Sequence, residues 1–184
     1  MRYTSVTNIS HLPLSAKHHR ESNDFDKMRG KSIIFTIVAL IASYNIATAQ
    51  TIALGEKTPR FKNEKWLNGN RPTESVFTYI EFIHSASIPC RKSAERIYAI
   101  TSTFENVAFV LITHQSASEV DHWVTNFINE RAGVIIDDEN IRASFGVNYA
   151  PYAVILDSKR QALWFGNPKL LDRKKLEKLL TTNE

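Results

Sequence analysis

Apolar residues from Val76 onward fall into short runs whose spacing alternates between that of a strand and that of a helix. The run 76–83 is rich in β-branched and aromatic residues, and 107–112 is continuously apolar, which is typical of buried strands. Between them, apolar residues recur on a helical period from Pro89 onward, and proline is tolerated in the first turn of a helix. The pattern therefore predicts a strand, a helix and a second strand in this order.

The rest of the chain continues this alternation. Ser118 is a favourable cap for a helix over 120–128, because a serine side chain accepts hydrogen bonds from the first backbone N–H groups of a helix. The other expected elements are a short apolar segment at 134–136, a helical turn at 141–145 ended by Gly146, a hairpin of 152–156 and 162–165, and an amphipathic helix at 170–180. Residues 50–75 resemble loops and turns. This order predicts an α/β fold, with a central mixed β-sheet flanked by helices on both faces.

Residues 28–49 have the layout of a secretory signal peptide. A short basic start precedes an apolar run at 33–42 and the small-x-small pattern Ala47-Thr48-Ala49. The apolar run is shorter than the roughly 20 residues that a transmembrane helix needs. We expect a cleavable leader and export to the periplasm or another exported location. The alternative is an uncleaved leader that stays as an N-terminal membrane anchor.

The leader predicts how the chain is divided. Residues 1–27 are polar and show no apolar period, so we interpret them as a disordered upstream extension, with translation starting at Met28. Residues 50–184, about 135 in number, are enough for one domain with a single core.

The charge balance argues against a nucleic-acid partner. The chain carries 23 Lys and Arg against 19 Asp and Glu, and residues 1–49 hold six of the basic and three of the acidic side chains. The remaining 17 basic and 16 acidic residues nearly cancel, whereas a nucleic-acid surface needs an excess of clustered positive charge. We expect contact with a membrane only through an uncleaved leader.

The chain holds one cysteine, Cys90, which follows Pro89 and precedes the basic pair Arg91-Lys92. An exported protein with a single cysteine cannot form an internal disulfide, so its stability must come from core packing. A lone thiol in an oxidising compartment is either buried and inert or available for a mixed disulfide. The histidines do not have the spacing of a metal site, and we expect neither a metal nor another cofactor.

Several segments between Leu54 and Leu180 stand in a characteristic order and spacing. They are Gly55-x-x-x-Pro59, Trp66-Leu67-Asn68-Gly69, Glu81-Phe82, Ser87-Ile88-Pro89-Cys90, Phe145 to Pro151, Val154 to Asp157, and Leu163 to Gly166. Together they resemble the thioredoxin-like superfamily, and within it the exported TlpA/ResA-like branch of thiol-disulfide oxidoreductases. The resemblance implies a thioredoxin-like fold.

The resemblance also implies a role for each of five residues. Cys90 matches the second, resolving cysteine of a Cys-x-x-Cys motif, and Ser87 stands where the nucleophilic first cysteine is expected. Glu81 matches the buried acid that assists the resolving cysteine. Pro151 matches the cis-proline, whose neighbouring backbone at Ala150 pairs with an extended substrate. Since thiol–disulfide exchange needs a thiolate, a serine at position 87 predicts the loss of dithiol chemistry.

Each of these residues also has a purely structural interpretation. Cys90 is equally well explained as a buried core thiol, because cysteine is among the most buried residue types. Ser87 can be a plain helix cap, and Pro151 can simply fix a turn. Glu81 can be hydrated at the edge of the sheet.

Three hypotheses for the function remain. The first is an exported thioredoxin-like protein that lacks dithiol reductase activity and binds extended or cysteine-bearing client peptides. The second is a monothiol redox protein in which Cys90 exchanges with a periplasmic thiol-disulfide partner. The third is a thiol transferase in which Ser87 hydrogen-bonds the thiolate of a small substrate.

Overall fold

The computed structural model of the chain describes residues 52–61, 64–137 and 139–183. The predicted signal peptide at 28–49 and the predicted extension at 1–27 lie outside these ranges. Within the described ranges, no helix combines the length and the apolar composition that crossing a bilayer requires.

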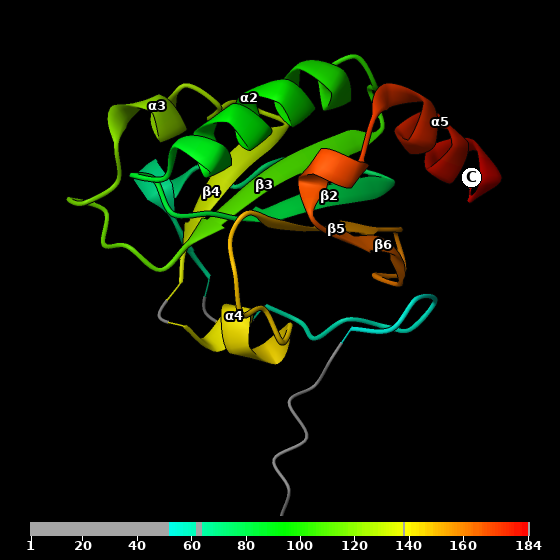
Figure 1. Cartoon of the computed structure of the whole chain (residues 1–184), viewed down its shortest axis with the longest axis horizontal. Helices are drawn as coiled ribbons and strands as arrows, with labels where there is room; N and C mark the ends of the chain where they lie inside the picture. Colours follow the sequence, from blue (N-terminus) through cyan, green and yellow to red (C-terminus); the bar gives the residue numbers. More distant parts are fainter. Residues whose placement is uncertain (1–51, 62–63, 138, 184) are drawn as a thin grey trace, which may run out of the picture. The chain divides into compact units, whose positions relative to one another are not determined.

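The described residues form a six-stranded sheet in the order β1-β4-β3-β2-β5-β6, shown in Figure 1. The elements are β1 (Lys65–Trp66), the 3₁₀ turn η1 (Leu67–Gly69), β2 (Phe77–Phe82), α2 (Ile88–Thr101), β3 (Val107–Thr113), α3 (His122–Thr125), β4 (Ala132–Ile136), α4 (Asn140–Ser144), β5 (Tyr152–Leu156), β6 (Ala162–Gly166), the 3₁₀ turn η2 (Pro168–Leu170) and α5 (Arg173–Thr182). β2, β3 and β4 run parallel, while β1, β5 and β6 pair antiparallel with their neighbours. The sheet is therefore mixed, as the sequence predicts.

Helices cover both faces of this sheet. On one face, α2, α3 and α5 bury residues such as Ile97, Val124 and Leu176 against Tyr79 and Phe109. On the other face, α4 and the residues that follow it bury Ile141 and Phe145 against the opposite side chains of the same strands. Figure 1 shows α2 and α5 on one side of the strands and α4 on the other. All seven residues of β3 are buried, as expected for a parallel strand covered on both faces.

The prediction of a helix over 120–128 capped by Ser118 is wrong. The helix there, α3, is only four residues long, and its N-cap residue is Asp121. The Ser118 hydroxyl instead hydrogen-bonds the Ser116 hydroxyl at 3.1 Å. The chain leaves the helix early because it must turn into β4, and Asn129 bridges backbone to backbone with Ala132 at that turn.

Two other boundaries differ from the sequence prediction. The segment 50–75 is not only loop, since Lys65 and Trp66 form β1 and pair with Ile136 and Ile135 of β4. The terminal helix α5 begins at Arg173 rather than at 170, because Asp172 accepts a hydrogen bond from the Lys175 N–H at 2.8 Å and caps it. Residues 168–170 form the separate turn η2.

Gly133 of β4 allows the segment around β1 to lie directly on the sheet. A Cβ atom at this position would meet Pro72 Cδ at 2.8 Å, the Asn70 carbonyl oxygen at 2.9 Å and Trp66 Cζ3 at 2.9 Å. Two of these distances involve a backbone oxygen and a large ring, which cannot yield cheaply. The close approach therefore requires glycine.

We predict that Gly133→Ala lowers the free energy of unfolding by about 1–3 kcal/mol, because the added methyl group overpacks this contact. Urea denaturation measures the loss, and the indole N–H resonance of Trp66 should shift in the same variant, since that group donates to Glu64. An unchanged free energy of unfolding together with an unshifted resonance would contradict the contact.

Candidate functional site

Ser87 caps the helix that carries Cys90. It is the N-cap residue of α2, and its hydroxyl accepts a hydrogen bond from the Cys90 N–H at 3.4 Å. The Ser87 N–H donates to the His84 carbonyl at 2.9 Å, which closes the turn before the helix. Pro89 occupies the first helical turn, where the missing N–H costs nothing. The cap interpretation of Ser87 is thus satisfied in the structure.

Ser85 ties this turn to the rest of the molecule through three hydrogen bonds. Its N–H donates to Gln115 Oε1 at 2.6 Å, and its hydroxyl accepts from the Asp121 N–H at 3.2 Å. Its carbonyl accepts from Trp123 Nε1 at 2.8 Å. Gln115 and Trp123 follow β3, so the loop after β2 is held by the loop and helix after the neighbouring strand. This anchoring fixes where α2 begins.

Cys90 is completely buried, with 0% of its surface exposed. It lies in the layer between α2 and the sheet, in the cluster that contains Ala94 and Ile97. A thiol exchanges with a partner only if the partner's sulfur can reach it. In this conformation Cys90 is a core residue, which agrees with the structural interpretation of its presence.

Glu81 is also completely buried, on the central strand β2. Its neighbours across the sheet are Leu111 and Ala153, so the alternative of a carboxylate hydrated at a sheet edge is wrong. The Tyr79 hydroxyl donates a hydrogen bond of 2.6 Å to Glu81 Oε2. Among the described residues, neither Glu81 Oε1 nor the buried Ser93 hydroxyl makes a hydrogen bond.

Burial raises the pKa of the Glu81 carboxyl from 4.5 to about 7. The Tyr79 hydroxyl, the nearby Ser93 hydroxyl and the positive charge of Arg96 each pull the pKa down, but together they offset only part of the desolvation. The Ser93 hydroxyl lowers the pKa of Glu81 as a nearby dipole, because the two side chains do not meet the geometry of a hydrogen bond. The same burial, followed by the charge of Glu81, raises the pKa of Tyr79. Glu81 is therefore a group that can gain or lose a proton near neutral pH.

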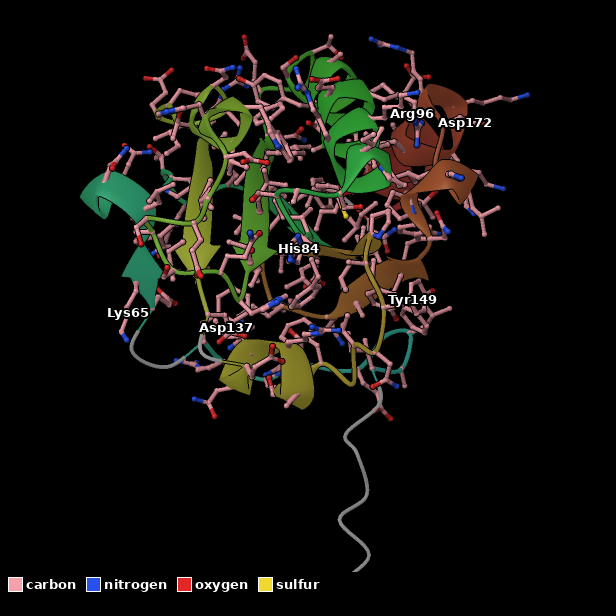
Figure 2. All side chains as sticks on the ribbon, turned by 60° about the vertical axis from the view of Figure 1, so that its left-hand side comes forward. Lys65, His84, Arg96, Asp137, Tyr149 and Asp172 are labelled. Atoms are coloured by element: carbon pink, nitrogen blue, oxygen red, sulfur yellow. The ribbon has the colours of Figure 1, made fainter. Side chains whose placement is uncertain are left out.

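The peptide bond between Ala150 and Pro151 is cis, as the resemblance implies. Pro151 is buried and Ala150 is exposed. β5 starts at the next residue, Tyr152, which pairs with Phe82 at the end of β2. The loop before β5 and the loop after β2 therefore leave the sheet at the same edge. In Figure 2, His84 marks the second loop and Tyr149 the first.

Two large apolar side chains are exposed on these segments. Ile88, the first residue of α2, is 68% exposed, and Tyr149, just before the cis peptide, is 50% exposed. The Tyr149 ring packs edge-on against Tyr152, with 5.3 Å between ring centroids. We call Ser87, Ile88, Tyr149, Ala150 and Pro151 the loop surface. It combines the exposed Ala150 with two exposed apolar side chains.

The structure thus divides the predicted residues into two groups. Ser87, Ala150 and Pro151 belong to loops at one edge of the sheet, while Cys90 and Glu81 lie in the core layer beneath α2. The sequence interpretation missed Tyr79 and Ser93. Strand spacing places Tyr79 on the same face as Glu81, and helix spacing places Ser93 on the same face as Cys90, so both could have been found.

The structure also brings together His84 and His114, whose rings lie 5.4 Å apart. Their separation in the sequence gives no sign of this, but β2 and β3 are parallel neighbours and end at the same edge. His114 Nδ1 lies 3.9 Å from a Glu139 carboxylate oxygen. Across the described ranges, His, Cys, Asp and Glu side chains never gather in groups of three or more that could hold a metal ion.

Comparison with known proteins identifies the architecture. No family model matches the chain, and no curated protein matches it. Solved structures do match. The thioredoxin domain of a thiol-disulfide oxidoreductase from Bacteroides vulgatus aligns with a TM-score of 0.57 and 12% identity, over 73% of this chain and 100% of that one. The fold is thioredoxin-like.

Two further structures support this assignment of the thioredoxin-like fold. A thioredoxin-like protein from Aeropyrum pernix matches with a TM-score of 0.51 and 13% identity, over 84% of this chain and 99% of that one. The peroxidoxin BcpB from Mycobacterium tuberculosis matches with a TM-score of 0.53 and 16% identity, over 72% of this chain and 96% of that one. At these identities the likeness establishes the fold and leaves the activity to be argued from the site.

The pKa of Glu81 predicts a specific dependence of stability on pH. Between about pH 4.5 and 7 the folded protein retains a proton that the unfolded chain has already released. The free energy of unfolding should therefore fall as the pH rises through this window, by about 3 kcal/mol in total. Glu81→Gln removes the titration and should flatten this part of the profile.

Urea denaturation of both proteins from pH 4 to pH 8 measures the difference. Tyr79→Phe is a second test, since it removes a hydrogen bond that lowers the pKa and should extend the descending part of the profile to higher pH, with its start near pH 4.5 unchanged. Parallel profiles for the wild type and Glu81→Gln would contradict the raised pKa.

Proposed function

We propose that this chain is an exported thioredoxin-like protein that binds extended or cysteine-bearing client segments at the loop surface without reducing their disulfides. One observation carries the proposal: Ser87, at the cap of α2, occupies the position that the resemblance assigns to the attacking cysteine, while the one sulfur of the motif is buried. Export follows from the predicted leader and belongs to the proposal.

The absence of reductase activity follows from the chemistry at positions 87 and 90. Disulfide reduction by a dithiol needs a thiolate to attack the substrate and a second thiol to resolve the mixed disulfide. The chain has one cysteine in total, and a serine hydroxyl cannot form the mixed disulfide. Glu81 retains a pKa suited to proton transfer, but without the first thiol no exchange reaction draws on it.

Binding of an extended segment is supported by the loop before β5. Ala150 is exposed at the edge where β2 ends and β5 begins, and an extended peptide can pair with an exposed loop segment as an added strand. Ile88 and Tyr149 are large apolar side chains exposed on the loops at this edge, and exposed large apolar residues can supply contacts to a partner.

The two other hypotheses receive less support. Exchange through Cys90 alone requires the α2 terminus to open, because the thiol is buried in the closed conformation. A transferase mechanism would need the Ser87 hydroxyl to donate to a bound thiolate. That hydroxyl already accepts the cap hydrogen bond, although its proton remains available to donate.

We predict that the native protein does not reduce insulin with dithiothreitol faster than the reagent alone, and that Ser87→Cys gains a measurable rate. The substitution restores a dithiol at a helix N-terminus, where the dipole favours a thiolate. Turbidity from the precipitating insulin chain measures the rate. The double variant Ser87→Cys/Cys90→Ser is the control, because it keeps the new thiol and removes the resolving one. Turnover by the native protein would overturn the proposal.

We predict that Ile88→Glu weakens binding of reduced, carboxymethylated α-lactalbumin, an extended chain without free thiols, by roughly tenfold, because a charge replaces an apolar contact. Fluorescence anisotropy of the labelled probe measures the dissociation constant. Leu170→Glu is a matched control, since Leu170 is also 68% exposed but lies on η2. An equal loss of affinity in both variants, or no binding by the native protein, would contradict client binding at the loop surface.

A further inference from the structure

Two histidines stand side by side at the edge of the sheet that carries the loop surface. β2 and β3 run parallel, and their pairing ends with Phe82 beside Ile112. His84 and His114 each lie two residues beyond this pair, so they occupy equivalent positions after neighbouring strands. Their ring centroids are 5.4 Å apart, and the ring planes are inclined by 60°. The register of the two strands therefore brings the two imidazoles together.

Hydrogen bonds of the backbone hold both histidines in place. Just before them, the Ile83 N–H donates to the Ile112 carbonyl at 2.8 Å. Just after them, the Ser85 N–H donates to Gln115 Oε1 at 2.6 Å. The two chain segments are thus joined on both sides of the pair. A ligand that binds between the rings does not have to order the backbone first, which favours binding.

The separation of the two rings suits a shared metal ion. Zinc binds imidazole nitrogen at about 2.0–2.1 Å, so two imidazoles on one tetrahedral ion have ring centroids about 5 Å apart. The 5.4 Å between His84 and His114 is close to this value. Imidazole is a favoured ligand of Zn²⁺, Cu²⁺ and Ni²⁺, whereas Mg²⁺ and Ca²⁺ prefer oxygen. The pair therefore favours a transition metal.

Glu139 is placed to orient one of the two rings. Its Oε1 lies 3.9 Å from His114 Nδ1 and 3.7 Å from an Arg142 guanidinium nitrogen. A histidine that binds a metal usually directs its other ring N–H to a carboxylate, which fixes the tautomer. Since Nδ1 of His114 faces Glu139, Nε2 is the nitrogen left for a metal.

The pair is accessible to solvent. The His114 side chain is 35% exposed, and His84 is half-buried. In the part of the chain that the structure describes, no three His, Cys, Asp or Glu side chains form a set that could hold a metal ion. An ion on two imidazoles therefore keeps water at its other positions, as open zinc sites do.

We propose that His84 and His114 together bind one divalent transition-metal ion of the class that favours imidazole: Zn²⁺, Cu²⁺ or Ni²⁺. The site lies next to the loop surface, because His114 and Ala150 line the same small depression. Neither histidine belongs to the loop surface, so the metal site does not depend on the proposed function.

Titration calorimetry of the full-length chain with zinc chloride tests the proposal. The titrations use a His18→Ala/His19→Ala background, because these are the other adjacent histidines of the chain. We expect His84→Ala or His114→Ala to weaken binding roughly tenfold or more, because the second imidazole of a pair binds at a high effective concentration. Replacing both should weaken it little further, since one imidazole alone cannot chelate. His122→Ala is the matched control, an exposed histidine on α3.

The ring resonances give a second measurement that needs no substitution at the site. In proton–nitrogen spectra of the same background protein, Zn²⁺ should shift the imidazole signals of His84 and His114 and leave those of His122 in place. Mg²⁺ should shift none of them. The proposal is overturned if Zn²⁺ does not shift the two rings together. It is also overturned if His84→Ala and His122→Ala change the affinity for Zn²⁺ alike.

Discussion

The double pairing of β2 is the constraint on which the rest of the structure depends. This strand pairs with β3 in parallel and with β5 in antiparallel, so its end defines one edge from which three loops emerge. The loop after β2 leads into α2 and is held by Gln115 of the loop after β3 and Trp123 of α3, and the loop before β5 carries the cis peptide. Since all three are fixed by main-chain pairing, the loop surface does not depend on the chemistry at position 90.

The fold therefore does not need a thiol at position 87. An N-cap side chain needs an oxygen that accepts a backbone N–H, and the Ser87 hydroxyl provides one. Cys90 stabilises the core by its burial, whether or not it reacts. Glu81 is different. Among the described residues its carboxyl makes no ion pair and accepts one hydrogen bond, from the Tyr79 hydroxyl, so its ionisation in the core costs stability as the pH rises toward its pKa.

At the opposite end of β2, the face of the sheet that carries α4 is not covered by a helix. α4 is five residues long and covers only part of its face, and the extended segment 52–61 lies on that same side in Figure 1. Residues 54 to 58 bond to the start of β6 and the turn before it, through bridges from Leu54 to Ala162 and from Lys57 to Gln161. A cavity of about 480 Å³, whose lining includes Arg60 and Arg160, therefore lies where no described helix packs on the sheet. The Arg160 guanidinium there is oriented by the carbonyl oxygens of Thr58 and Pro59.

The amino-acid sequence by itself determined the alternation of strands and helices and the mixed sheet with helices on both faces, and it singled out Ser87, Ala150 and Pro151. Periodicity carries this information because each strand or helix must bury one side of itself. Only the tertiary structure decided that α3 ends after four residues, that Lys65 and Trp66 form a strand, and that His84 meets His114. It also decided that Glu81 is buried rather than hydrated, and that Arg60 and Arg160 share one cavity. These depend on contacts between residues far apart in the chain, whose free energies no local pattern records.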